Sequence, residues 1–167
     1  MAITNNVTRL LDARKIPHTI YELSAEKHGA LETARLLDLE PASVFKTIVV
    51  TRDKPTSSPK GKKPLLVVVP GPSNVDLKLL ALALGEKKVY LTTEREAEQL
   101  TGLQAGGISP LALINKGFQV VIDISAQNYS AIHVSGGQRG LNIKLPVADL
   151  VKLTNARLVA VSKPEDN

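Results

Sequence analysis

Apolar residues recur along the chain at helical spacing in some segments and at strand spacing in others. Val7, Leu10 and Leu11 follow helical spacing, and Pro17 is predicted to end this first helix. Further helices are predicted at residues 29–39, 73–85, 93–102 and 146–154. Runs rich in β-branched residues predict strands at residues 18–23, 43–51, 64–70, 87–92, 118–123, 130–135, 141–145 and 156–162.

Capping signals mark the ends of two of these helices. Ser73 or Asn74 is the predicted N-cap of the third helix, and Gly85 lies just past its end. Thr93 and Glu96, three residues apart, form a capping-box pattern at the start of the fourth helix.

The order of these elements favours a mixed α/β (α+β) fold. The strands are not regularly separated by long helices, so a doubly wound parallel sheet is less expected than a curved mixed sheet with short helices packed around it. The length of 167 residues fits a single domain spanning residues 1–167, and no repeat or linker interrupts it.

Composition narrows the chemistry that the chain can perform. The absence of cysteine excludes disulfides, thiolate metal sites and a cysteine nucleophile. The net charge of +5 favours an anionic partner, such as a nucleic acid or a phosphorylated ligand, although many small basic proteins bind neither. The N-terminus lacks the apolar core of a signal peptide, and no apolar run is long enough to span a bilayer, which predicts a cytoplasmic protein.

Lys46 is the most informative single residue. Strand alternation places it on the face of Val44, Ile48 and Val50, and the opposite face is also largely apolar. A buried ammonium is costly unless an anionic or polar group meets it. Lys46 is therefore predicted either to hold a phosphate, carboxylate or oxyanion in a cleft, or to extend its charge to water from a strand edge. Lys144, in contrast, is predicted to point outward.

Two glycine-rich segments are candidate ligand-binding loops. One is Gly106 to Pro110, and the other, Ser135 to Gly140, connects two predicted strands. From spacing alone each is first of all a turn, and the functional alternative brings backbone N–H groups or the Arg139 side chain to a ligand. Neither a GxGxxG fingerprint nor a Walker motif is present, so nothing indicates a dinucleotide or nucleoside triphosphate site.

The chain has no obvious metal site or general base. His18, His28 and His133 are not at metal-ligand spacing, and His133 shares a strand face with Ser135 near a glycine-rich turn. Asp123 ends a predicted strand and is interpreted as a cap rather than a catalyst. An enzyme built from these residues is expected to depend on positioning and electrostatic stabilisation.

Several runs, taken in order, resemble one known family. The runs VFKTIVV, DLKLLALALGEKKV, TGLQAGGISPLAL and VVIDISAQNYSAIHVSGGQRGL are similar to the YbaK family of aminoacyl-tRNA deacylases. These are free-standing relatives of the editing domain inserted in bacterial prolyl-tRNA synthetases. The resemblance spans the chain from about Thr8 to about Val161, and it implies a partly barrel-like mixed sheet.

The resemblance implies hydrolysis of the ester that joins a wrong amino acid to the 3′ CCA end of tRNA. Cys-tRNA(Pro) is the favoured substrate, with Ala or Ser as the alternative amino acids, and prolyl-tRNA synthetase is a candidate partner. In this family the reaction needs no metal or cofactor, since the terminal ribose hydroxyl positions water or a cysteine substrate attacks with its own thiol. A non-catalytic module that binds tRNA or a synthetase is the alternative function.

The resemblance also implies roles for individual residues. The family lysine corresponds to Lys46, and the G-x-x-x-P loop corresponds to Gly106 through Pro110. Lys46, Gly106 and Gly107 would act on the terminal phosphate or the ester carbonyl. The implied substrate-binding residues are Tyr21, Thr47, Ile108, Ser109, Pro110, Ser135, Gly136, Gly137, Arg139 and Asn142.

Two features depart from the family pattern. Bacterial members commonly read R-G-L-D where this chain reads R-G-L-N, so Asn142 lacks a charge that could orient a substrate group and leaves the amino-acid specificity open. The loop at residues 52–64 holds five basic residues and one acid and is longer than usual. It is expected either to contact the tRNA backbone through its charge or to form a solvated hairpin tip.

Overall fold

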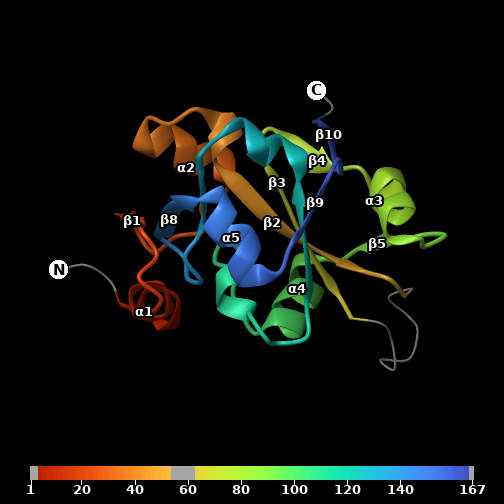
Figure 1. The fold of residues 1–167 in the computed structure, drawn as a ribbon, viewed down its shortest axis with the longest axis horizontal. Coiled ribbons are helices and arrows are strands. Elements are labelled where there is room, and N and C mark those ends of the chain that lie inside the picture. Colours follow the sequence, from red (N-terminus) through yellow and green to blue (C-terminus); the bar gives the residue numbers. More distant parts are fainter. Residues whose placement is uncertain (1–3, 54–62, 166–167) are drawn as a thin grey trace.

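A mixed five-stranded sheet forms the centre of the computed structural model, which describes residues 4–53 and 63–165 (Figure 1). Its strands, in spatial order, are β5 (Tyr90–Leu91), β2 (Phe45–Thr51), β3 (Leu65–Pro70), β6 (Gln119–Asp123) and β9 (Arg157–Val159). β2 pairs antiparallel with β3 and β5, whereas β3, β6 and β9 are parallel. The predicted hairpin on either side of the basic loop is therefore confirmed, while residues 54–62 of that loop lie outside the described residues.

β3 separates two apolar cores. All of its residues are buried, with Leu66 and Val68 in one core and Leu65, Val67 and Val69 in the other. Because both faces of this central strand are covered, its sequence is a continuous apolar run instead of an alternating one. The scarcity of aromatic residues fits cores built mainly from leucine, valine and isoleucine.

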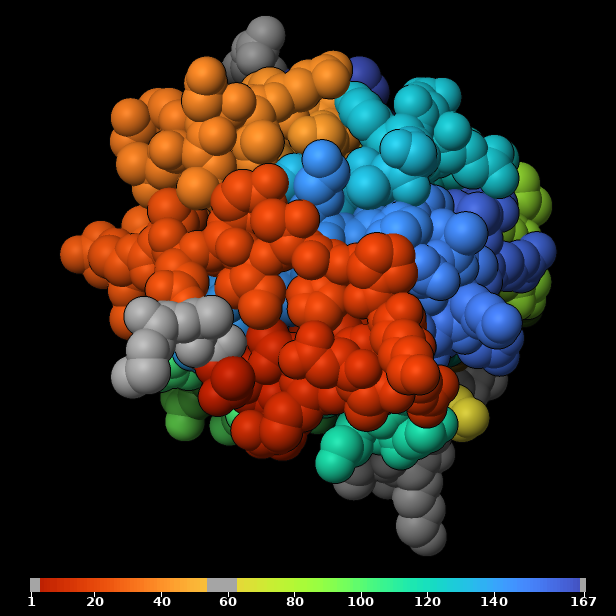
Figure 2. All heavy atoms as spheres, turned by 60° about the vertical axis from the view of Figure 1, so that its left-hand side comes forward, coloured from red at the N-terminus to blue at the C-terminus, as the bar shows by residue number. Residues whose placement is uncertain are grey.

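Two smaller antiparallel sheets complete the described strands. One has the order β1 (Thr19–Glu22), β8 (Leu141–Pro146), β7 (Ala131–Ser135), and the other pairs β4 (Ser73–Val75) with β10 (Ser162–Pro164). Figure 2 shows the red and orange N-terminal residues lying beside blue residues from the C-terminal part, as the β1–β8 pairing requires. A bridge between Val44 and His133 joins β7 to the start of β2. The described strands thus form a mixed, curved arrangement, as expected, but no closed barrel.

Five α-helices of eight residues each surround the sheets in the described part of the chain. They are α1 (Asn6–Ala13), α2 (Ala30–Leu37), α3 (Leu77–Leu84), α4 (Glu94–Thr101) and α5 (Val147–Thr154). α1 lies at one end of the molecule and α3 at the other (Figure 1). No helix within residues 4–53 and 63–165 combines the length and the apolar character needed to cross a bilayer.

The helix ends agree with the sequence except that α1 ends at Ala13, before the predicted stop at Pro17, and that α3 has a different N-cap. Thr93 and Glu96 form the predicted capping box of α4, and Gly85 ends α3 in the left-handed conformation. The predicted N-cap of α3, Ser73 or Asn74, is wrong because residues 73–75 pair with β10 as a strand. Asp76 is the N-cap instead, and its carboxylate accepts hydrogen bonds from the first turn.

Asp123 explains why the predicted strand at residues 156–162 is divided. Its buried carboxylate accepts a hydrogen bond from the Val161 N–H at 2.9 Å and another from the Ser125 N–H at 3.1 Å. Both β6 and β9 therefore end near this carboxylate. The next strand, β10, begins at Ser162 and pairs with β4. The interpretation of Asp123 as a cap is confirmed, since it caps the 3-10 helix at Ile124–Asn128.

Candidate active site

A cavity of about 320 Å³ lies beside β2. Its walls come from β2, the segment before α2, the start of α4, the first glycine-rich loop and the ends of β7 and β8 that face each other. The predicted site residues that line it are Lys46, Thr47, Gly106, Ile108, Ser135 and Asn142. Segments more than a hundred positions apart in the sequence therefore meet around one space.

Lys46 lies at the edge of this cavity with its ammonium partly exposed. Its Nζ donates to the Gly71 carbonyl oxygen at 3.1 Å and to the Glu165 carboxylate at 3.0 Å, and its side chain is 24% exposed. A lysine ammonium has three N–H donors, so one remains for a ligand. The Glu165 carboxylate shows that an anion fits against this ammonium.

The two glycine-rich loops pack against each other. A Cβ added to Gly107 would come 2.9 Å from the backbone of Gln138, and the Arg139 Nε donates to the Ala105 carbonyl oxygen at 2.7 Å. Gly106 has a φ of +90°, which residues with a Cβ rarely adopt. One glycine is therefore required by contact between the loops, and the other by its backbone conformation.

Backbone N–H groups of the first glycine-rich loop differ in availability. The Gly107 N–H donates to the Gln104 carbonyl oxygen at 2.8 Å and is used within the turn. The N–H groups of Gly106 and Ile108 donate to no residue in the described part of the chain, and both residues line the cavity. Available backbone donors in a cavity are the groups that stabilise a developing oxyanion. The N–H groups of Gly106 and Ile108 are therefore candidates for this role, whereas the Gly107 N–H holds the turn.

The remaining predicted residues do not line the cavity. They are Tyr21, Gly107, Ser109, Pro110, Gly136, Gly137 and Arg139. Ser109 is fully buried, and its hydroxyl caps the 3-10 helix at Pro110–Leu113 by accepting the Leu111 N–H. The Tyr21 ring packs against the His133 ring with centroids 5.3 Å apart. A Cβ at Gly136 would collide with the Leu141 side chain.

The cavity includes charged residues that the sequence did not single out. Lys27 forms an ion pair with Glu94, which joins the segment before α2 to the N-terminus of α4. Both side chains are more than half exposed, so the pair lies at the cavity mouth. No sequence signal could have located it, because Lys27 lies in a polar segment without periodicity and its partner is 67 positions away.

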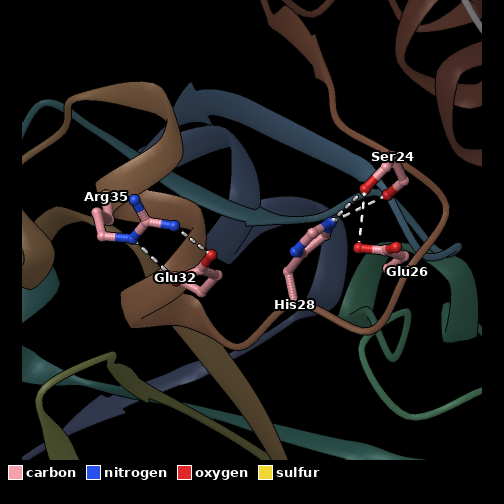
Figure 3. Close-up of polar contacts among 5 residues, drawn as sticks. All are labelled: Ser24, Glu26, His28, Glu32 and Arg35. Atoms are coloured by element: carbon pink, nitrogen blue, oxygen red, sulfur yellow. Dashed lines mark hydrogen bonds and ion pairs between the residues drawn. The ribbon is translucent and has the colours of Figure 1, made fainter.

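His28 also lines the cavity, although its spacing from the other histidines did not single it out as a metal ligand. Its Nε2 is 3.1 Å from both the hydroxyl and the carbonyl oxygen of Ser24. A carbonyl oxygen only accepts hydrogen bonds, so Nε2 carries the proton. Figure 3 shows the His28 ring facing Ser24, with the Glu32–Arg35 pair separate on α2.

His133 and Asn142 form a buried polar pair between β7 and β8. The Asn142 Oδ1 accepts a hydrogen bond from the His133 Nδ1 at 2.9 Å, and both residues are buried. Burial lowers the pKa of His133, the Asn142 hydrogen bond opposes this by raising the pKa, and the charge of Lys144 lowers it. Lys144 itself is exposed, as predicted. Asn142 therefore holds one ring nitrogen of a buried histidine beside the cavity.

This pair predicts a pH-dependent stability. Because the folded-state pKa of His133 lies below its ordinary value of 6.5, the unfolded chain takes up the proton more readily. The free energy of unfolding is expected to decrease as the pH falls from about 6.5 through the folded-state pKa. Asn142→Asp should weaken this decrease, since a carboxylate stabilises the imidazolium.

Chemical denaturation of both proteins between pH 7.5 and pH 5.5 measures this difference. The other titrating groups are common to the two proteins, so the difference in their pH profiles reports on the His133 pair. Superimposable profiles would contradict this account of Asn142.

Comparisons with known proteins place this chain among aminoacyl-tRNA editing domains. The model of the aminoacyl-tRNA editing domain matches residues 24–153. A protein of Enterococcus faecalis named "Putative Cys-tRNA(Pro)/Cys-tRNA(Cys) deacylase EbsC" is 35% identical over 162 residues, which cover 96% of this chain and 94% of that protein.

Solved structures share the fold over nearly the whole chain. The crystal structure of a hypothetical protein has a TM-score of 0.82 at 23% identity and covers 95% of this chain and 100% of its own. A structure titled as a "putative trans-editing enzyme for prolyl tRNA synthetase" has a TM-score of 0.76 at 22% identity and covers 97% and 99%. At these identities the structures show a common fold.

Proposed function

Because the chain belongs to the aminoacyl-tRNA editing domain family, we propose that it removes a wrong amino acid from tRNA by cleaving the aminoacyl ester. Cys-tRNA(Pro) is the proposed substrate, supported by the name of the relative that is 35% identical. The observation that carries the proposal is that Lys46, Gly106 and Ile108 line one cavity, and that the N–H groups of the last two have no partner in the described part of the chain.

The cavity residues act on the ester by binding and charge stabilisation. Attack of a water oxygen on the carbonyl carbon places negative charge on the carbonyl oxygen. The Gly106 and Ile108 N–H groups then donate to that oxygen, and Lys46 holds the same oxygen or the terminal phosphate. The carbon–oxygen bond to the ribose breaks, the ribose oxygen takes a proton, and the free amino acid and tRNA leave. The substrate's own ribose hydroxyl positions the water in place of a general base. With a cysteine substrate, the thiol sulfur attacks the carbonyl carbon instead of water, the carbon–oxygen bond to the ribose breaks, and the ribose oxygen takes the thiol proton.

Asn142 is the proposed contact for the amino-acid part of the substrate. Its Oδ1 is occupied by His133, whereas its Nδ2 donates to no residue that the structure describes. Because Asn142 lines the cavity, this amide can donate a hydrogen bond to the substrate without adding a negative charge. Thr47 and Ser135, which line the same space, add hydroxyl groups to the pocket.

Deacylation of tRNA for proline charged with cysteine, alanine or serine tests the proposal. Purified protein is expected to release cysteine fastest, and each rate is compared with spontaneous loss in buffer. If all three charged tRNAs persist as they do in buffer while the protein still binds tRNA, the chain is a non-catalytic tRNA-binding module instead.

A further inference from the structure

A second pocket adjoins the active-site cavity on the far side of Lys46. Lys46, Ile48 and Thr92 line both spaces, so the two are adjacent along β2. The other walls of the second pocket come from β4, the first turn of α3, β5 and β10, and they carry Lys78 and Lys163. We call this space the lysine pocket, after Lys46, Lys78 and Lys163.

Two of the three lysines of this pocket have no acidic partner among residues 4–53 and 63–165, whereas Lys46 pairs with Glu165. Lys78 and Lys163 are exposed, and neither forms an ion pair or side-chain hydrogen bond with a residue in the described ranges. Asp76, the acidic residue among those lining the pocket, already accepts the N–H groups of Lys78 and Leu79 at 3.1 Å as the cap of α3. The free ammonium groups therefore favour an anionic ligand.

An apolar surface lies between these lysines. Ile48, Val75, Leu77 and Leu91 line the pocket, and Leu91 is 51% exposed although it is a large apolar residue. A positively charged groove with an apolar surface fits single-stranded nucleic acid, whose phosphates meet the cations while its bases cover the apolar groups. A small free anion would use the lysines and leave the apolar surface uncovered.

We propose that the lysine pocket binds the phosphodiester backbone of the single-stranded 3′ end of tRNA, directly before the nucleotide whose ester enters the cavity. This inference rests on the proposed deacylase function. Because both spaces share Lys46, a strand with its terminal ester in the cavity passes Lys46 and continues toward Lys78 and Lys163. A phosphate at Lys46 displaces the Glu165 carboxylate, which holds this position in the free protein.

Replacing Lys78 and Lys163 together by alanine tests the pocket. We expect kcat/KM to fall about tenfold more for mischarged tRNA than for the same amino acid esterified to adenosine, which lacks phosphates. The matched control replaces Lys116 and Lys152, which are exposed before β6 and on α5 and do not line either space. Equal effects of the two double variants on the tRNA substrate would overturn the proposal.

Binding of uncharged tRNA gives a readout that does not depend on catalysis. Each phosphate contact with a single strand contributes about 0.7 to the slope of log affinity against log salt concentration. The Lys78 and Lys163 double variant should therefore reduce this slope by about 1.4, and Glu165→Gln should raise affinity about twofold by freeing Lys46. A slope equal to that of the control variant rejects the pocket, whereas absent deacylation by the unmodified protein rejects only the proposed function.

Discussion

Replacing Lys46 by alanine is expected to reduce kcat/KM for deacylation of mischarged tRNA by at least about a hundredfold, as loss of a preorganised oxyanion donor does in other hydrolases. The ammonium is the cation shared by the cavity and the lysine pocket, so its removal affects both the ester and the nearby phosphate. The free energy of unfolding should change by less than about 1 kcal/mol, because the Lys46–Glu165 pair is partly exposed.

Two variants make this result specific to Lys46. Lys144→Ala removes an exposed lysine on β8 that lines neither space, and it should leave the rate unchanged. Lys46→Arg keeps the charge but changes the shape of the donor group, so we expect a rate between those of the alanine variant and the unmodified protein. Full activity of Lys46→Ala on mischarged tRNA would remove this residue from the site.

Gly107→Ala is expected to lower the deacylation rate about tenfold or more and to destabilise the protein by about 1–3 kcal/mol. The added methyl group would meet backbone atoms of Gln138 at 2.9 Å, and backbone cannot rotate away as a flexible side chain can. The two glycine-rich loops would have to separate, which moves the N–H groups of Gly106 and Ile108 away from the ester.

The control for this variant is Gly102→Ala at the end of α4. Gly102 has a positive φ, +73°, which Gly107 does not, and a Cβ there meets no atom within 4 Å. Its substitution should cost only about 1–2 kcal/mol of backbone strain and leave the cavity intact. Rates and denaturation curves for both variants, measured at a temperature where each is folded, separate loop position from general stability. Gly107→Ala with the activity of the control would show that contact between the loops does not position the donors.

Local signals in the sequence predicted local structure well. The Thr93–Glu96 capping box, the hairpin of β2 and β3 and the left-handed Gly85 all depend on neighbouring residues, which the sequence displays directly. The strand at residues 73–75 was missed because it exists only through pairing with β10, almost ninety positions later. The predicted helix cap, Ser73 or Asn74, therefore fell two or three residues before Asp76.

The same contrast between local signals and long-range contacts applies to the candidate site. Lys46 could be identified because a charged residue within an apolar strand is unusual, and Gly106 because glycines cluster at its loop. The sequence could not show that the Gly107 N–H is occupied by Gln104, or that Lys27 and Glu94 meet at the cavity mouth. Both facts depend on how distant segments and turns are placed in three dimensions.

Asn142 connects the departure from the family pattern to a physical consequence. Its side chain accepts a hydrogen bond from His133, whose pKa is lowered by burial, and leaves the Asn142 amide N–H groups for the cavity. The site is consequently less negative than one with aspartate at this position. The residue at position 142 therefore affects both the protonation of His133 and the polarity of the pocket proposed to receive the amino acid.

The rate of amino-acid release from Cys-tRNA(Pro) compared with that from correctly charged Pro-tRNA(Pro) tests the central claim most directly. An editing deacylase must cleave the wrong ester and spare the right one, so the unmodified protein is expected to release cysteine well above the rate in buffer and proline at the rate in buffer. Release of neither amino acid above the rate in buffer, or of both at equal rates, would contradict the assignment of this cavity as an editing site.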